Sequence, residues 1–245
     1  QRLEGLAYNL FDRVIAVSEH VREFLTDEFQ IEPGRIGTVC HGVDAFDSSA
    51  AHRPESLRDV QEGSFVFTAG SIRPARGLEE LLQAWGNVSA TLVIAGGVGP
   101  RMENYRQRLD RLARQTGAAA RVRWAGNLDA HEMAWCYGNC RAFVMTSHVE
   151  ACPNTALEAM SARCVCVSTD QPPMPEFFRD AAVYYRRQDA ESLRSALEQA
   201  LALSDEQRAI RSEVARSRAA GFTWAETARR TVEELRSVVG GPRSA

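Results

Sequence analysis

The chain has 245 residues, of which 44% are hydrophobic and 25% charged, and its formal net charge is −3. These values are ordinary for a globular protein and give no reason to expect nucleic acid or an acidic membrane surface as the main partner. Since no apolar stretch approaches the roughly 18 residues of a membrane span, we expect no transmembrane segment and a cytoplasmic location, with peripheral membrane association of the full-length protein left open. The chain begins at Gln1 rather than Met, which indicates a processed start or a piece of a longer protein.

Short apolar runs that suit buried strands alternate with helix-like segments along almost the whole chain. The apolar runs cover residues 13–17, 36–40, 65–69, 91–95, 122–124, 142–145, 164–167 and 182–185. Between some of them, apolar residues three and four apart mark one buried face of a helix. These faces carry Leu78, Leu81, Leu82 and Trp85, then Tyr105, Leu109 and Leu112, and then Leu193, Leu197, Ala200 and Leu201. The alternation predicts an α/β fold with a mostly parallel sheet and helices on both of its faces.

Two end segments fit a single-domain picture less well. Residues 1–30 contain a strand and an amphipathic stretch, and a turn signal, Glu-Pro-Gly, follows them at 32–34. Residues 222–239 form a separate amphipathic helix after a break at 219–221. From the residues alone, both segments either pack on the main sheet or are appendages that belong to a neighbouring domain.

The stretch 143–160 is the best candidate for a functional site. It reads as the end of a strand, a turn that carries Glu150, and the start of a helix that carries Glu158. Ligands of open α/β sheets bind at the carboxyl ends of strands, and the first amides of a helix offer an anion site. Those amides belong to Asn154, Thr155 and Ala156. Taken alone, two glutamates at this spacing are also common on solvated helices.

A second candidate is the segment 70–77, Gly-Ser-Ile-Arg-Pro-Ala-Arg-Gly, directly after the run 65–69. Its glycines let the backbone approach a ligand closely, and Arg73 and Arg76 could bind phosphate oxygens. It is not a P-loop, because no Gly-Lys-Ser/Thr follows. The alternative is a surface loop with two solvated arginines. The glycine-rich segment 95–100 is interpreted as a tight turn near a ligand.

Metal chemistry finds little support in the sequence. Cys136 and Cys140 have helical spacing but no second Cys or His pair nearby, so we expect no zinc site and free cytosolic thiols. The histidines show no metal spacing either. Only His148, beside Glu150 at a strand end, is placed near the chemistry.

The run from Glu150 to Glu158 and on to Met160, Glu-Ala-Cys-Pro-Asn-Thr-Ala-Leu-Glu-Ala-Met, resembles the Glu-x7-Glu signature of a known enzyme family. The family is that of retaining, nucleotide-sugar-dependent GT-B glycosyltransferases of the glycosyltransferase family 4 (group 1) type. Three further matches occur in the right order. Residues 11–18 resemble the end of its acceptor domain, His41-Gly42-Val43-Asp44 its Asn-Gly-Val-Asp turn, and 70–77 its phosphate loop. Together the matches cover nearly the whole chain.

The resemblance implies the C-terminal, donor-binding half of such an enzyme. Residues 1–30 would be the tail of the N-terminal acceptor domain, residues 31–221 a Rossmann-like nucleotide-sugar-binding domain, and residues 222–245 the C-terminal crossover helix and tail. The implied reaction transfers a sugar from a nucleotide-diphosphate sugar to an unknown acceptor with retention of configuration and without a metal. Because most of the acceptor domain is missing, donor binding without turnover is an expected outcome. Another GT-B enzyme, such as a sugar-nucleotide epimerase, and a non-catalytic binding module stay open as alternatives.

The resemblance also assigns roles to residues. The family's first glutamate contacts hydroxyls of the donor sugar and its second holds the ribose, which gives these roles to Glu150 and Glu158. Backbone amides near Asn154, Thr155 and Ala156 would take the diphosphate. The loop at Gly126 and Asn127 would lie near the base.

The phosphate loop departs from the family pattern. Arg76 occupies the place of the family's lysine and would neutralise the departing nucleotide beside Gly70. Ser71 replaces the family's arginine, which makes Arg73 the candidate to substitute for it. Pro172-Pro173 replaces a usual Gly-Gly pair, and prolines offer no backbone N–H to a phosphate.

Overall fold

The fold is organised around a six-stranded sheet with the order β5-β4-β3-β6-β7-β8. The computed structural model describes residue 8 and residues 10–239. Neighbouring strands of this sheet all run parallel, as the sequence predicts. The strands are β3 (Phe65–Ala69), β4 (Thr91–Ala95), β5 (Val122–Gly126), β6 (Ala142–Met145), β7 (Cys166–Thr169) and β8 (Ala182–Tyr185). β7 starts at Cys166 rather than at the predicted Cys164, because the Cys164 amide still donates to the Ala159 carbonyl of the preceding helix.

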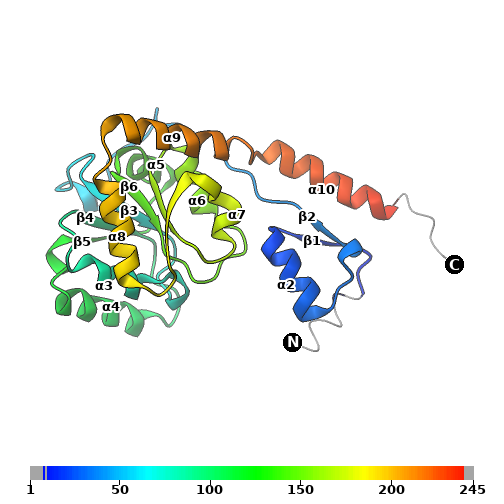
Figure 1. The fold of residues 1–245 in the computed structure, drawn as a ribbon, viewed down its shortest axis with the longest axis horizontal. Coiled ribbons are helices and arrows are strands. Elements are labelled where there is room, and N and C mark those ends of the chain that lie inside the picture. Colours follow the sequence, from blue (N-terminus) through cyan, green and yellow to red (C-terminus); the bar gives the residue numbers. More distant parts are fainter. Residues whose placement is uncertain (1–7, 9, 240–245) are drawn as a thin grey trace.

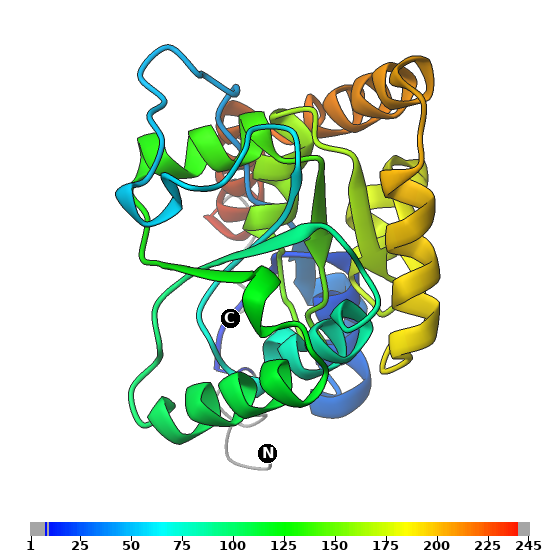
Figure 2. The ribbon, with the colours of Figure 1, turned by 90° about the vertical axis from the view of Figure 1, so that its left-hand side faces the viewer.

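Helices cover both faces of this sheet (Figure 1, Figure 2), which confirms the predicted α/β class. One face carries α3 (Leu78–Trp85), α4 (Glu103–Gln115) and α8 (Ala190–Leu201). The other carries α5 (Ala130–Asn139), α6 (Asn154–Ser161), α7 (Met174–Phe178) and α9 (Asp205–Ala219). We call the sheet with these helices the main unit. Short 3-10 turns lie at η1 (Pro33–Arg35), η2 (Glu55–Leu57), η3 (Pro74–Arg76), η4 (Ala119–Arg121) and η5 (Arg179–Ala181).

The main unit has an apolar core on each side of its sheet. Because successive strand residues point to opposite faces, Phe65 and Phe67 of β3 pack beneath α5 and α6, while Val66 packs beneath α3. Strands buried on both faces need apolar residues at consecutive positions. That requirement explains why the strands read as continuous apolar runs in the sequence.

The strand order reverses between β3 and β6. From β3 the chain passes outward to β4 and β5, and it then returns to place β6 on the other side of β3. In open parallel sheets this reversal opens a crevice at the carboxyl ends of the two strands, where ligands bind. Gly70 follows β3 and Thr146 follows β6, so the loops of both candidate motifs meet at this crevice.

A second, smaller unit precedes the main one in the chain. Its strands β1 (Val14–Ala16) and β2 (Ile36–Thr38) run parallel, and α2 (Glu19–Phe29) connects them. We call β1, β2 and α2 the small unit. Figure 1 shows it beside the main unit, with α2 in blue. Its apolar core consists of Ala16, Leu25, Ile31 and Ile36.

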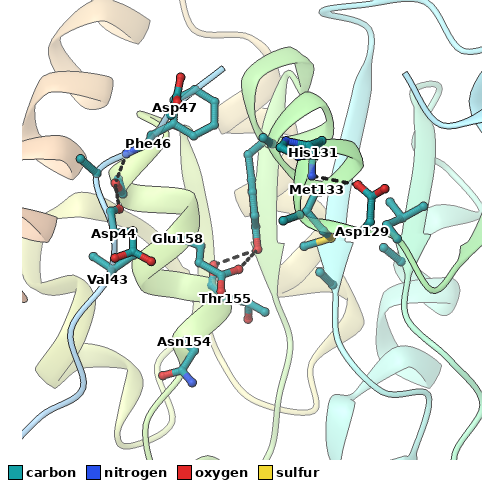
Figure 3. A pocket seen from close by; sticks show the side chains of 18 of the residues that line it. Val43, Asp44, Phe46, Asp47, Asp129, His131, Met133, Asn154, Thr155 and Glu158 are labelled. Atoms are coloured by element: carbon teal, nitrogen blue, oxygen red, sulfur yellow. Dashed lines mark hydrogen bonds between the residues drawn. The ribbon is translucent and has the colours of Figure 1, made fainter. Parts of the chain in front are cut away.

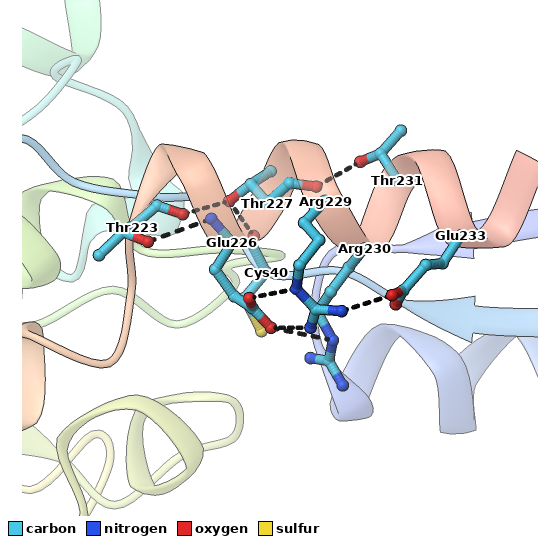
Figure 4. A network of polar contacts seen from close by, with 8 residues as sticks. All are labelled: Cys40, Thr223, Glu226, Thr227, Arg229, Arg230, Thr231 and Glu233. Atoms are coloured by element: carbon cyan, nitrogen blue, oxygen red, sulfur yellow. Dashed lines mark hydrogen bonds and ion pairs between the residues drawn. The ribbon is translucent and has the colours of Figure 1, made fainter.

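Helix α10 (Trp224–Val239) runs from the end of α9 along the small unit (Figure 1). Near its start, the hydroxyl of Thr227 donates to the carbonyl of Cys40 at 2.9 Å (Figure 4). Further along, Glu234 forms an ion pair with Arg13 at 2.5 Å. None of the side chains of α10 is buried within the described residues. Across those same residues, no helix combines the length and apolar character that crossing a membrane requires.

Candidate functional site

A pocket of about 700 Å³ opens at the carboxyl ends of β3 and β4 and beside α5 and α6 (Figure 3). Its size lies within the range of about 300–1,000 Å³ that is typical of small-molecule sites. The strand ends contribute Ala69, Gly70, Ala95 and Gly96, and the segment 42–47 also lines the pocket. The pocket therefore lies beside the strand reversal.

The pocket lining includes a carboxylate, that of Glu158. Glu158 projects from α6 into the pocket, and the hydroxyl of Tyr137 on α5 donates to its Oε2 at 2.8 Å (Figure 3). Burial raises the pKa of Glu158. Burial, together with the charge of Glu158, also raises the pKa of Tyr137, which keeps the phenol protonated as a donor. A carboxylate held in this way retains acceptor capacity for hydroxyl groups of a ligand.

An ion pair lies behind the pocket wall at Gly70, outside the lining. The Nη1 atom of Arg76 donates to Glu150 Oε1 at 2.5 Å and to the Ser147 hydroxyl at 2.9 Å. The exposed fractions of the Arg76 and Glu150 side chains are only 15% and 13%, so water screens the pair weakly. Burial lowers the pKa of Arg76, although an arginine remains protonated at neutral pH. The buried Nε of Arg76 lacks a hydrogen-bond partner among the described residues.

Gly70 brings this ion pair to the pocket wall. A Cβ at Gly70 would lie 1.7 Å from Arg76 Nη2, and the backbone φ of 136° also disfavours any other residue. Since Gly70 lines the pocket, the guanidinium of Arg76 lies directly against the pocket's backbone wall. Gly96, with φ of 134°, packs in turn against the Gly70 carbonyl, so the glycine-rich turn after β4 does lie beside the candidate site.

The structure brings together most of the residues that the sequence singled out. Five of them line the pocket: Gly70, Asn127, Asn154, Thr155 and Glu158. Arg76 and Glu150 are adjacent to it through Gly70. Ser71 and Arg73 have exposed side chains outside the pocket lining, and the positive charge of Arg73 contributes to lowering the pKa of Arg76. Gly126 also lies outside the lining, next to Asn127.

One expectation about the anion site needs correction. The amide of Asn154 donates to the Cys152 carbonyl at 3.0 Å, and the amide of Ala156 donates to the Pro153 carbonyl at 2.9 Å. Pro153 precedes α6 and allows the chain to turn tightly there, so these two amides are engaged locally. In this structure these two amides are not free donors, and the Ala156 side chain lies in the apolar core; phosphate binding by the start of α6 stays a prediction.

Several pocket residues were missed by the sequence reasoning. Asp44 belongs to the turn already matched to the family, but nothing in its spacing placed it in a pocket. Phe46 and Asp47 follow it in a segment without helical or strand periodicity, and Tyr137 lies on a helix that no apolar stripe predicted. The hydroxyl of Ser161 on α6 fixes this segment, because it donates to the Asp44 carbonyl and accepts from the Phe46 amide, each at 3.0 Å.

Acidic side chains, Asp44, Asp47, Asp129 and Glu158, contribute to the lining of the pocket (Figure 3). Within the described part of the chain, no group of three or more His, Cys, Asp and Glu side chains is arranged to hold a metal ion. The lining thus offers a carboxylate to hydroxyl groups at Glu158, and the cation Arg76 lies behind the wall at Gly70.

Comparison with known proteins identifies the family. The model of the glycosyl transferases group 1 family matches residues 51–218. The serotype-specific mannosyltransferase WbdA of Escherichia coli is 24% identical over 234 residues, which cover 91% of this chain and 28% of that protein. The D-inositol 3-phosphate glycosyltransferase of Frankia alni is 25% identical over 241 residues, which cover 91% of this chain and 58% of that protein. The chain thus spans between about a quarter and somewhat over half of the length of these relatives.

Solved structures agree on the fold. A glycosyltransferase from Rickettsia africae matches with a TM-score of 0.83 at 19% identity, over 95% of this chain and 64% of that one. Anabaena Alr3699/HepE in complex with UDP and glucose matches with a TM-score of 0.84 at 17% identity, over 96% of this chain and 66% of that one. These matches confirm the predicted Rossmann-like fold of GT-B proteins. The chain belongs to the glycosyl transferases group 1 family.

Proposed function

We propose that the chain is the donor-binding half of a retaining glycosyltransferase, which takes its sugar from a nucleotide-diphosphate sugar. The observation that carries the proposal is a pocket that contains the Glu158 carboxylate and has the Arg76–Glu150 pair behind its wall at Gly70. A nucleotide sugar has the matching pattern, because it carries ribose hydroxyls, a diphosphate and a sugar in sequence. We assign residues 1–30 to the tail of an acceptor domain, residues 31–221 to the donor domain and residues 222–245 to the crossover helix and tail.

Glu158 is the proposed ribose ligand. Its carboxylate already accepts one hydrogen bond, from Tyr137, and a vicinal diol would supply two more donors. Asn127 lies in the pocket near Gly97, a position that suits the base beyond the ribose. Anabaena Alr3699/HepE, which shares this fold, was solved in complex with UDP and glucose, and this supports a nucleotide sugar as the ligand class.

Arg76 is the proposed stabiliser of the leaving nucleotide. Negative charge grows on the diphosphate as the sugar departs, and a fixed donor aimed at such charge is worth about 3–4 kcal/mol in the transition state. The start of α6, with the Asn154 and Thr155 side chains in the pocket, adds the positive end of a helix dipole. Arg73, exposed but close enough to affect Arg76, would add a second cation when the diphosphate is bound.

Glu150 is the proposed sugar ligand. Glu150 accepts a hydrogen bond from Arg76. If Arg76 binds the diphosphate, the Glu150 carboxylate would lie next to the sugar that the diphosphate carries. In this role Glu150 orients hydroxyls and does not act as a general base. The proposal includes no metal ion, because Arg76 supplies the positive charge that a metal would otherwise bring to the phosphates.

A thermal-shift panel with UDP-, GDP-, ADP- and dTDP-sugars tests the proposal on this chain. A donor at 100 times its Kd should stabilise the protein by about 2.7 kcal/mol, with no dependence on added Mg²⁺ or EDTA. Glu158→Ala should abolish most of that shift, whereas Glu206→Ala, an exposed glutamate in the first turn of α9, should leave it unchanged. A panel in which no nucleotide sugar shifts the unfolding midpoint would overturn the proposal.

The acceptor and the stereochemical outcome belong to the longer enzyme. We propose that an acceptor domain preceding this chain completes the active site, and that the anomeric linkage of the product matches that of the donor. NMR of the product made by the longer protein measures this directly, and an inverted linkage would contradict retention. The family match gives no support to an epimerase.

A further inference from the structure

A buried carboxylate lies behind the phosphate loop, outside the pocket. Glu80 on α3 is only 5% exposed, and the hydroxyl of Tyr185, at the end of β8, donates to its Oε1 at 2.8 Å. Its second oxygen, Oε2, is buried without a hydrogen-bond partner among the described residues. Burial and the charge of Glu80 raise the pKa of Tyr185, so the phenol stays a donor. Burying a carboxylate is costly unless it is paired.

His148 provides the pairing. Its Nε2 lies 3.3 Å from Glu80 Oε1, and its side chain is 19% exposed. A carboxylate accepts hydrogen bonds, so this contact is a hydrogen bond in the His148 tautomer that carries its proton on Nε2. Gly77 makes the contact possible, because a Cβ there would lie 2.8 Å from His148 Nε2 and 2.1 Å from the Thr146 carbonyl.

The backbone around His148 is joined to the phosphate loop at neighbouring positions. The His148 amide donates to the Ala75 carbonyl at 2.8 Å, and the Thr146 hydroxyl donates to the Arg76 carbonyl at 2.6 Å. Two residues further on, Glu150 receives its hydrogen bond from Arg76. The imidazole of His148 thus adds a contact from the segment 146–150 to Glu80 on α3.

We propose that Glu80 and His148 are positioning residues for the donor site: Glu80, anchored by Tyr185, holds His148, and His148 holds the segment 146–150 where Glu150 and Arg76 meet. An apolar side chain at position 80 would pack in the surrounding apolar core without the desolvation cost of a carboxylate. The contact to His148 is what the carboxylate adds. This inference rests on the proposed function, since it concerns the same donor site.

A double-mutant cycle tests the proposal with UDP-glucose and GDP-mannose as probes, measured by calorimetry. His148→Ala should weaken binding of whichever probe the wild type binds by about tenfold, the scale of a misplaced hydrogen bond to a charged group. Glu150→Gln should weaken it as well. The loss in the double variant should be smaller than the sum of the two single losses, because His148 acts through the placement of the same Glu150–Arg76 pair.

Controls separate positioning from a merely structural role. His148→Gln, whose side-chain amide can donate to Glu80, should restore most of the affinity. Val149→Ala, in the same segment but with a 65% exposed side chain, should bind like the wild type. Additive losses in the cycle, or wild-type affinity in His148→Ala, would overturn the inference while leaving the proposed function intact.

Hydrogen exchange of the protein without ligand tests the positioning role of His148 separately from the proposed donor binding. Hydrogen exchange should accelerate in the segments 73–77 and 146–150 of His148→Ala and stay at the wild-type rate in Val149→Ala. Unchanged exchange in His148→Ala would contradict the positioning role, whether or not any nucleotide sugar binds. Failure of the wild type to bind any probe, with accelerated exchange in the variant, would instead count against the proposed function alone.

Discussion

The main unit and the small unit differ in how they bury apolar side chains. The sheet of the main unit has a core on each face, and rings such as Trp85, Phe67 and Phe143 are fully buried. The small unit has a sheet of only two strands. Large apolar residues remain exposed both in the small unit, at Phe24, and in α10, at Leu235 and Val239. Two strands alone give only marginal stability in water.

This difference indicates which part of the molecule carries its own stability. The main unit has the two covered faces that a parallel sheet requires. The small unit is held from outside: Glu176 of α7 accepts from the amides of Glu19 and His20 at the start of α2, at 2.8 and 3.2 Å. Its order therefore depends on the main unit and on α10.

The largest effect is expected from opening the core of the main unit. Phe67 is fully buried between the rings of Tyr137 and Phe143, with centroids 5.2 and 6.2 Å away. Phe67→Ala should cost about 3–5 kcal/mol in the free energy of unfolding, as measured by urea denaturation. Phe24→Ala, the same change at a 47% exposed position of α2, should cost far less. Equal losses would break the comparison between the two units.

A smaller, local effect is expected in the core of the small unit. Leu25 is 5% exposed and packs with Ile31 and Ile36. Leu25→Ala should cost about 2–5 kcal/mol, but the loss should fall on the small unit alone. Hydrogen exchange should accelerate across residues 14–38 while residues 65–185 keep their protection. A matching loss of protection in β3 to β8 would show that the two units unfold together.

The sequence predicted the main unit better than the site. Its strands were found because both faces are buried, which leaves apolar runs such as 65–69 and 142–145 that match β3 and β6. Helix α9 was not predicted, since it buries only Ala215 and Ala219 and shows no apolar stripe. Periodicity reports burial, so an element that buries small residues leaves almost no signal.

The candidate site also contains residues that the sequence singled out and residues that it did not. Glu150, Arg76 and Glu158 were found because strand ends and glycines precede them in the sequence. Tyr137, which supports Glu158, was not found, because the contact joins two helices that are distant in the chain. The engaged amides at the start of α6 were also missed, because local turn geometry at Pro153 decides them and residue types do not. Long-range contacts and exact turns needed the structure.

The pocket carboxylate Glu158 should show a pH effect on stability with a definite sign. Burial raises the pKa of Glu158 above its ordinary value of 4.5, and the hydrogen bond from Tyr137 offsets this only in part. Above pH 4.5 the native state therefore holds a proton that the unfolded chain has released, so Glu158 makes stability fall as pH rises through the folded pKa. Glu158→Gln should remove this decline in urea-unfolding series at several pH values. Glu206→Gln, at an exposed site, should keep it, and identical slopes in all three proteins would contradict the effect.

The smallest effect is expected where α10 joins the small unit. Arg13 donates to Glu234 at 2.5 Å, with side chains 25% and 20% exposed, and Gly37 of β2 leaves room for the carboxylate. Arg13→Met removes the charge but keeps much of the apolar stem, and the loss should stay within about 0.2–1 kcal/mol because solvent still reaches the pair. It should appear as faster hydrogen exchange in residues 14–38 and should shrink in about 1 M salt, where the Debye length falls to about 3 Å.

Arg229→Met is the matched control for this ion pair. The partners of Arg229, Glu226 and Glu233, lie on α10 itself (Figure 4), so this change removes ion pairs without touching the small unit. Exchange in residues 14–38 should therefore stay at the wild-type rate. If Arg229→Met loosened the small unit as much as Arg13→Met does, helix stability of α10 rather than the contact with Arg13 would hold the small unit in place.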